Sequence, residues 1–295
     1  MKKDTSVNVQ PARTSSLSGR RVAVVGGTGG IGQALSRQMA TQGAQVIVVG
    51  RTFRDAGTAG IDFVQADLSL MSEAERVAKD LPAEDLDMLV LTTGIFAAPQ
   101  RQETTEGLER DMAVSYLSRL VLVRNLADRL GTGRPPGAPQ PRIFVYGYPG
   151  TGQTAHLGDL NFEQSYAAMK AHMSTVAGNE ALVVDAAQRY PAVGVFGLNP
   201  GLIKTSIRSN MLGQNSVKHR ATETVIGWFT PSADTYAKRI LPLLTTPDLD
   251  GRTGLMFDKK GAAILPSPAM TPQHASQVVI ASIDLLHRVV PGTQV

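Results

Sequence analysis

The sequence predicts a doubly wound α/β fold, in which a largely parallel sheet is covered by helices on both faces. Residues 22–25 (VAVV) form a short apolar, β-branched run, as expected for a strand buried on both faces. A turn follows with five glycines among residues 26–32, and apolar residues then recur at helical spacing. Strand-like and helix-like segments alternate in this way as far as residue 258, which predicts one parallel sheet.

The glycine-rich turn between the first strand and the first helix predicts a nucleotide site. Glycines permit a tight turn, allow backbone N–H groups to approach a pyrophosphate and let the helix pack closely on the strand. The helix N-terminus then offers unpaired donors and a partial positive charge. A flexible glycine loop would explain the composition alone, but the strand before it and the helix after it favour the nucleotide site.

The composition excludes several classes of protein and site. The chain has 29 Lys and Arg against 25 Asp and Glu, with no basic run, so nucleic-acid binding is not predicted. It has no cysteine, which excludes disulfides, thiolate metal sites and a cysteine nucleophile. The five histidines lack HExxH spacing, so no metal site is expected. No apolar stretch reaches the roughly 20 residues that span a bilayer.

We expect one domain over residues 20–295. Residues 1–19 begin with two lysines and then turn polar, so they lack a signal-peptide core and are predicted to be a disordered leader of a cytoplasmic protein. The Pro- and Gly-rich stretch 131–141 is interpreted as an exposed loop within the domain, because a strand-like run over 143–146 follows at once.

The end of the second predicted strand, 45–49, carries Arg51 and Thr52. In dinucleotide folds a carboxylate at this point holds the 2′-hydroxyl of NAD, whereas an arginine accommodates the 2′-phosphate of NADP. Arg51 therefore favours NADP(H), since a guanidinium can bind a phosphate in bidentate fashion. The alternative is a solvated loop arginine.

Tyr166 and Lys170 are four residues apart, so on a helix they share a face. A phenol with a pKa near 10 is a poor acid or base at neutral pH. An ammonium group beside it stabilises the phenolate and lowers that pKa towards the working range. We therefore expect Tyr166 to act as the acid/base and Lys170 as its partner, with two surface helix residues as the alternative.

These features together resemble the short-chain dehydrogenases/reductases. The turn Gly26-xxx-Gly30-x-Gly32 is similar to the family's TGxxxGIG motif, and the YxxxK pair follows about 140 residues later. Residues 199–205 resemble the family's Pro-Gly-xxx-Thr signature, and residues 156–166 (HLGDLNFEQSY) look like an insert of the retinol-dehydrogenase-like branch. The resemblance covers residues 19–268 and implies a single Rossmann-fold domain, a nicotinamide cofactor and, as in many relatives, a homo-oligomer; buried core explains the same apolar helices without a partner.

The resemblance also assigns the cofactor-binding positions. Asp67 and the Leu68 backbone would meet the adenine, with Asp67 alternatively an N-cap, and Pro200, Gly201, Ile203 and Thr205 would meet the nicotinamide. Tyr166 and Lys170 would contact the nicotinamide end as well. The remaining expected contacts are Gly26, Thr28, Gly29, Gly30, Ile31, Gly32, Arg51, Thr52, Thr92, Thr93 and Gly94.

The chain departs from the family at several positions. Thr92-Thr93 stands where relatives have asparagines, so the hydrogen bonds that bridge the strands must come from other groups. By resemblance to the family's motifs, Ser115 stands at the catalytic asparagine and Tyr148, or Gly147 after a one-residue slip, at the catalytic serine. We therefore expect an altered catalytic set of Tyr166, Lys170, Tyr148 and Ser115.

The resulting prediction is an NADP(H)-dependent oxidoreductase that interconverts a carbonyl and an alcohol on an apolar small molecule. The alternative is a catalytically silent NADP-binding sensor or scaffold. Residues 204–232 are rich in apolar side chains and are expected to form a substrate loop or to pack on the core. Residues 273–289 are predicted to form an amphipathic helix that covers the body, joins a partner or touches a membrane surface.

Overall fold

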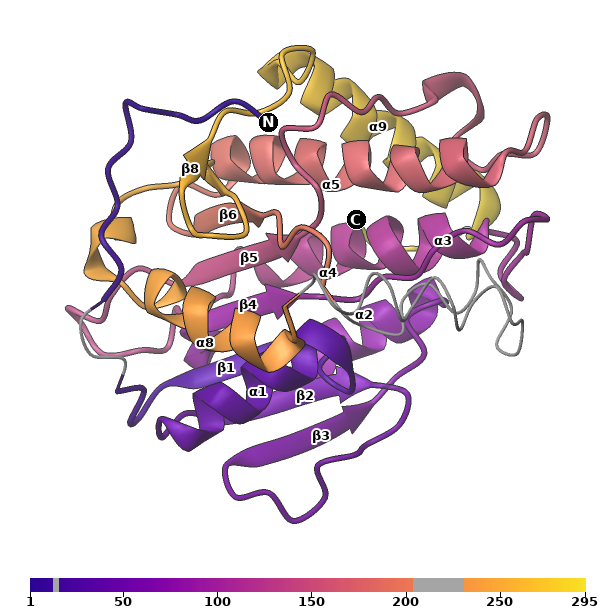
Figure 1. The fold of residues 1–295 in the computed structure, drawn as a ribbon. Coiled ribbons are helices and arrows are strands. Elements are labelled where there is room, and N and C mark those ends of the chain that lie inside the picture. Colours follow the sequence, from indigo (N-terminus) through magenta and orange to yellow (C-terminus); the bar gives the residue numbers. More distant parts are fainter. Residues whose placement is uncertain (13–15, 204–230) are drawn as a thin grey trace.

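The predicted fold class is confirmed by the computed structural model, which describes residues 1–12, 16–203 and 231–295. Within these residues, eight strands form one sheet in the order β3-β2-β1-β4-β5-β6-β7-β8, parallel except for the antiparallel β7–β8 pair (Figure 1). The strands are β1 (Arg21–Val25), β2 (Gln45–Gly50), β3 (Ile61–Gln65), β4 (Met88–Leu91), β5 (Arg142–Tyr146), β6 (Gly194–Leu198), β7 (Met256–Phe257) and β8 (Ala263–Ile264).

Helices cover both faces of the sheet (Figure 1). Helices α1 and α8 pack together on one face, whereas α2, α4 and α5 lie on the other, and α9 packs against α5. The helices are α1 (Gly30–Thr41), α2 (Met71–Asp80), α3 (Arg110–Met112), α4 (Ser118–Leu126), α5 (Ala168–Arg189), α8 (Ala233–Leu244) and α9 (Pro272–Val289). Short helical turns lie at η1 (Ala83–Asp85), η2 (Ala113–Leu117), η3 (Leu157–Asp159) and η5 (Pro247–Leu249).

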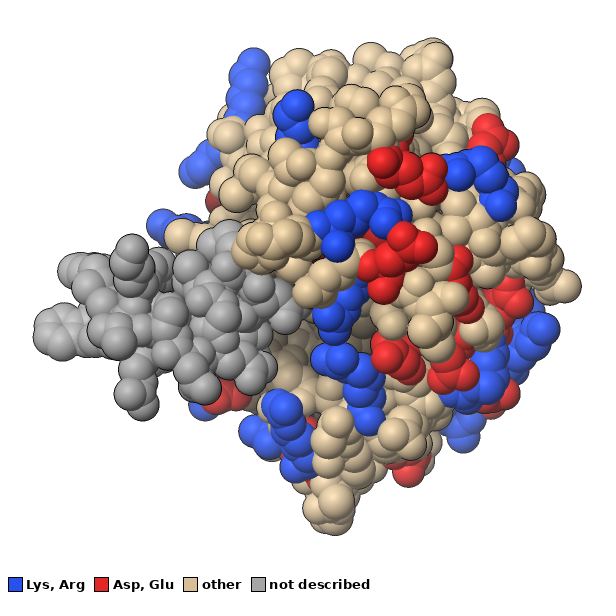
Figure 2. Space-filling view, turned by 90° about the vertical axis from the view of Figure 1, so that its right-hand side faces the viewer, with Lys and Arg blue, Asp and Glu red and all other residues tan. Residues whose placement is uncertain are grey.

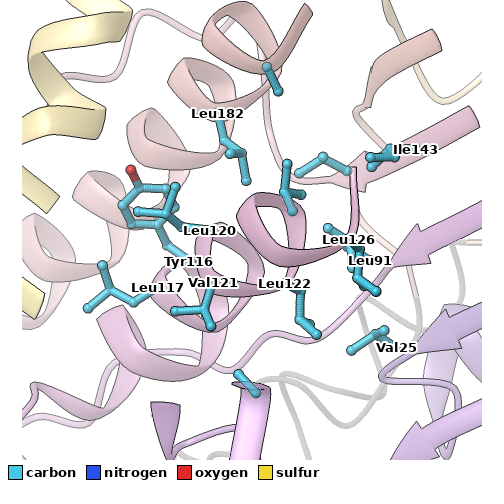
Figure 3. Packing of buried hydrophobic residues seen from close by; sticks show 14 of the residues in the cluster. Val25, Leu91, Tyr116, Leu117, Leu120, Val121, Leu122, Leu126, Ile143 and Leu182 are labelled. Atoms are coloured by element: carbon cyan, nitrogen blue, oxygen red, sulfur yellow. The ribbon is translucent and has the colours of Figure 1, made fainter. Parts of the chain in front are cut away.

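The two-sided burial of β1 follows from the alternation of side chains along a strand. Val22 and Val24 join the core beneath α1 and α8, while Ala23 and Val25 join the core beneath α2 and α4. Figure 3 shows the second core, in which Val25 and Leu91 from the sheet meet Leu122 and Leu126 of α4. At the outer side of this core the hydroxyl groups of Tyr116 and Ser282 lie 2.9 Å apart and link η2 to α9.

The amino-terminal segment packs on the body, so the prediction of a disordered leader is wrong for the residues described there. Lys3 forms a β-bridge with Ile264, and the N–H of Asp4 donates to the carbonyl of Ala263 at 3.0 Å. The polar composition of this segment gave no signal of the pairing, because backbone groups alone make it.

Two parts of the chain depart from regular helix and strand. The helical stretch after β4 begins at α3 and passes through a π-helical turn at η2 before α4. Strand β7 is short, because the Asp258 carboxylate accepts from the N–H groups of Lys260 and Ala262 and turns the chain back into β8.

Candidate functional site

A cleft of about 340 Å³ opens where the carboxyl ends of β1, β2 and β4 meet. Parallel α/β sheets bind ligands at this edge. Figure 2 faces this edge of the sheet and shows Lys and Arg side chains gathered near the middle of the face. Most of the predicted cofactor contacts line the cleft: Gly26, Thr28, Gly29, Gly30, Ile31, Arg51, Thr52, Asp67, Leu68, Thr92, Thr93 and Gly94.

The glycines of the turn are required by close approach as well as by backbone conformation. Gly26 has a φ of +86°, and a Cβ there would lie 2.6 Å from the backbone nitrogen of Thr93. A Cβ on Gly32 would lie 2.5 Å from the carbonyl oxygen of Gly26 and 2.4 Å from Thr92 Oγ1. Gly32 therefore supports the turn from behind without lining the cleft. This cradle fits a dinucleotide, because the turn presents bare backbone to the space in front of it.

Arginines surround the cleft. Arg51 is exposed and lines it, as does Arg54, whose Nη1 lies 3.7 Å from the Cβ position of Gly29. Arg110, at the start of α3, lines the same cleft. Sequence reasoning singled out Arg51 alone, because Arg54 and Arg110 come from segments with no distinguishing pattern.

A second pocket, of about 170 Å³, adjoins the first. The two share Ile31, Ile95 and the segment 92–94, so they form one continuous depression. The second pocket reaches the ends of β5 and β6 and is lined by Tyr148, Ser115 and the predicted nicotinamide contacts Pro200, Gly201 and Ile203. Thr205, and all of the predicted substrate loop but residues 231–232, lie outside the described residues.

A hydrogen-bonded chain from α3 reaches this second pocket. The Asp111 carboxylate is fully buried and accepts from the Ser115 hydroxyl through Oδ1, while its Oδ2 lies 2.8 Å from Nδ1 of His172. His172 lines the pocket and stacks on Phe96, with ring centroids 4.1 Å apart. Ser115, at the position aligned with the family's asparagine, also accepts from the N–H of Ile95 at 3.0 Å.

Arg119 makes hydrogen bonds between strand ends. In relatives the asparagines at the positions of Thr92 and Thr93 would make such bonds. Its guanidinium donates to the carbonyls of Thr93 and Tyr146 and to Oδ1 of Asn179, thereby joining the ends of β4, β5 and helix α5. The Thr92 hydroxyl adds a bond to the carbonyl of Val25 at 2.9 Å. Burial lowers the pKa of Arg119 to about 9, with the charge of Asp111 opposing, so the guanidinium stays protonated at neutral pH.

Known proteins share this architecture. Residues 20–138 match the family model of short chain dehydrogenases. The chain is 50% identical over 276 residues to an uncharacterised oxidoreductase of Saccharomyces cerevisiae, with 92% of this chain and 89% of that protein covered. The chain belongs to the short-chain dehydrogenase/reductase family. It is therefore an oxidoreductase of a family that binds a nicotinamide cofactor.

One further relative and one solved structure are similar to this chain. Retinol dehydrogenase 14 of Mus musculus is 24% identical over 279 residues, with 85% of this chain and 81% of that protein covered, in keeping with the predicted likeness to that branch. A short-chain dehydrogenase from Shigella flexneri, solved with NADP, has a TM-score of 0.60 at 17% identity, with 84% of this chain and all of that one covered. The latter likeness concerns the fold alone.

The YxxxK pair is not placed as a short-chain dehydrogenase would require, and the prediction that both residues share a helix face is wrong. Helix α5 begins at Ala168, after Tyr166, and Ala167 is extended. Lys170 is exposed, and neither residue lines the second pocket. The cause lies upstream, where the Asp159 carboxylate accepts from the N–H groups of residues 163–165 and holds them in a turn outside the helix.

The surroundings of Tyr166 also oppose the expected activation of its phenol. The hydroxyl donates to the carbonyl of Ala98 at 2.5 Å, and the ring packs edge-on against Phe162. Burial, together with the charges of Glu109 and Asp111, raises the pKa of Tyr166 to about 12. Activation would require the pKa to fall, so Tyr166 in this position anchors the loop after β4 to the start of α5.

Sequence reasoning missed Asp111, Arg119 and His172. A signal was present for two of them, because Asp111, Ser115 and Arg119 recur every four residues and make a polar stripe in an otherwise apolar helix. His172 could be recognised only once the start of α5 was known. Val176 and Asn179, which also line the second pocket, lie on the same face of that helix as His172.

Glu109, the N-cap of α3, is expected to make the unfolding free energy of the protein depend on pH. Its carboxylate accepts from the N–H of Met112, but burial raises its pKa from 4.5 to about 7, with the charge of Asp111 adding to the shift. The folded state therefore binds more protons than the unfolded state between these pH values, and stability is lost as pH rises through about 7.

We expect Glu109→Gln to remove this loss. Relative to wild type, the variant should gain up to about 3 kcal/mol in unfolding free energy as pH rises from about 4.5 to 8. Urea denaturation at several pH values, followed by circular dichroism, measures the difference. A difference that is constant with pH would contradict the assignment.

Proposed function

We propose that this protein is an NADP(H)-dependent oxidoreductase that interconverts a carbonyl and an alcohol on an apolar small molecule. The observation that carries the proposal is the continuous depression formed by the two pockets, with Arg51 lining the first pocket and Pro200 and Gly201 lining the second. NADPH, when bound, supplies the hydride for a carbonyl carbon. The glycine turn and Thr92–Gly94 segment would hold the dinucleotide, and Arg51 its 2′-phosphate.

Cofactor choice tests the role of Arg51. We expect Arg51→Ala to lower the preference for NADPH over NADH about ten- to a hundredfold, because a charge-assisted phosphate contact contributes roughly 1.5–3 kcal/mol. Dissociation constants of both nucleotides are measured by calorimetric titration. Arg21→Ala is the control, since Arg21 begins β1 and so lies at the opposite edge of the sheet. An unchanged ratio in Arg51→Ala would refute the assignment.

The lining of the second pocket supports an apolar substrate. Ile95, Phe96, Val176, Leu202 and Ile203 contribute to its wall. Incubation of the protein with NADPH and a panel of aliphatic and aromatic carbonyl compounds, followed by the loss of NADPH absorbance, tests turnover directly. Turnover that increases with the apolar size of the carbonyl compound supports the proposed substrate class.

A catalytically silent NADP-binding protein is the second candidate. The observation that favours it is the position of Tyr166 and Lys170 away from the second pocket. Tight binding of NADPH without turnover of any compound in the panel would select this candidate. Turnover by wild type would reject it and would require a proton donor other than the family's tyrosine.

A further inference from the structure

We propose that His172, oriented by Asp111, is the catalytic acid and base of this protein; the inference rests on the proposed function and names the group that performs its proton transfer. Helix α5 places the imidazole of His172 at the second pocket and beside the carboxylate of Asp111.

The hydrogen bonds determine which nitrogen of His172 can react. Nδ1 lies 2.8 Å from Oδ2 of Asp111, and that carboxylate is fully buried. A carboxylate acceptor fixes a hydrogen on Nδ1, which leaves Nε2 to donate or accept a proton. The side chain of His172 is 15% exposed, and it lines the pocket, so substrate can reach the ring. Stacking on Phe96 holds the plane of the ring.

The carboxylate is itself restrained. Its second oxygen accepts from the Ser115 hydroxyl, and the Arg119 guanidinium balances its charge electrostatically. Asp111 therefore cannot turn away from the imidazole without breaking its hydrogen bond with Ser115. This arrangement holds the imidazole ring in one orientation while Nε2 exchanges a proton with the substrate oxygen.

Four of the other polar side chains that line the second pocket fit the role less well. Ser115 donates to Asp111, and Thr175 donates to the carbonyl of His172. Arg119 is engaged with carbonyl groups at the strand ends, and burial holds the pKa of Tyr146 well above its ordinary value. Among the pocket-lining residues that the structure describes, histidine is the type whose proton exchanges readily near neutral pH.

With His172 as the proton donor, the atoms and charges of the reaction balance. In the direction of reduction the carbonyl π bond breaks, the carbon receives a hydride from NADPH, which becomes NADP⁺, and the oxygen receives the proton of Nε2. His172 is left neutral, with Nδ1–H still bound to Asp111, and regains a proton from solvent. In the direction of oxidation the neutral Nε2 accepts the hydroxyl proton as the carbon gives up its hydride to NADP⁺.

Kinetics of matched variants test the proposal. We expect His172→Gln to lower kcat at least about a hundredfold, with the dissociation constant of NADPH changed less than about threefold. His287→Gln, at an exposed position of α9, is the control and should match wild type. Tyr166→Phe should keep most of the activity. Activity that survives His172→Gln, or that is lost in Tyr166→Phe but not in His172→Gln, would overturn the proposal.

A second measurement does not depend on turnover. It therefore distinguishes failure of the role proposed for His172 from failure of the proposed function. In ¹⁵N-histidine spectra, assigned by comparison with His172→Gln, the neutral His172 ring should carry its hydrogen on Nδ1, and addition of NADP⁺ should shift its Nε2 resonance. Asp111→Asn should redistribute the hydrogen between the nitrogens, an effect that a purely structural role would not produce. No turnover by wild type would reject the proposed function, whereas an Nε2 resonance unmoved by saturating NADP⁺ would reject the role of His172.

Discussion

Replacing Gly32 with alanine is expected to abolish nucleotide binding, although alanine is the better helix former. Gly32 lies in the first turn of α1, where helix propensity alone would stabilise the variant by about 1 kcal/mol. A Cβ at this position would lie 2.5 Å from the carbonyl oxygen of Gly26, which is backbone and can yield only if the whole turn moves. Overpacking costs about 1–3 kcal/mol, and here the displaced group is the phosphate cradle itself.

Calorimetric titration with NADPH measures this effect, and we expect the dissociation constant to rise at least about a hundredfold. Gly158→Ala is the matched control, because no atom lies within 4 Å of its Cβ position. Circular dichroism should show the fold retained in both variants. Binding by Gly32→Ala at wild-type affinity would mean that the nucleotide does not contact this turn.

Replacing Arg119 with methionine is expected to give the largest loss of stability among our predictions. The change leaves the carbonyls of Thr93 and Tyr146 without their donor and removes the positive charge near the buried Asp111. Breaking a buried charged network by removing one member costs about 3–5 kcal/mol. Methionine retains much of the aliphatic volume, so the loss reports on the hydrogen bonds and the charge.

Urea denaturation followed by circular dichroism measures the loss. Arg21→Met is the control, because its ion pair with Asp85 is about half exposed on both sides and should contribute less than about 1 kcal/mol. Arg119→Lys should fall between the two, since an ammonium keeps the charge but cannot reproduce the planar set of donors. Equal stability of Arg119→Met and wild type would show that the strand ends hold together without the guanidinium.

The sequence predicted the sheet and the glycine-rich turn that lines the cleft, because local patterns determine both. Buried parallel strands are continuous apolar runs, and a turn such as Gly26–Gly32 is confined to a few adjacent residues. The start of α5 was not predictable in this way. It depends on the carboxylate of Asp159, which draws the N–H groups of residues 163–165 out of the helix without any glycine or proline to mark the break.

The side chains that we propose to be catalytic could not be predicted from the sequence, because contacts between distant residues bring them together. His172 and Asp111 are 61 residues apart in sequence, and neither carries a motif that would join them. The four-residue spacing marks Arg119 as one of three polar positions but does not reveal its strand-bridging role, because an arginine in such a helix predicts a solvated position more readily than a buried one. A motif such as YxxxK, by contrast, was visible in the sequence although the fold does not bring it to the second pocket.

The packing of α9 on α5 affects how the chain folds during synthesis. Ala177 and Ala181 of α5 are covered by Ala275 and Val278 of α9, which follow far downstream. The sheet can form as its strands leave the ribosome, but this face of α5 stays uncovered until α9 has emerged as well. An incompletely synthesised chain therefore presents a small-residue apolar stripe to solvent until α9 has emerged.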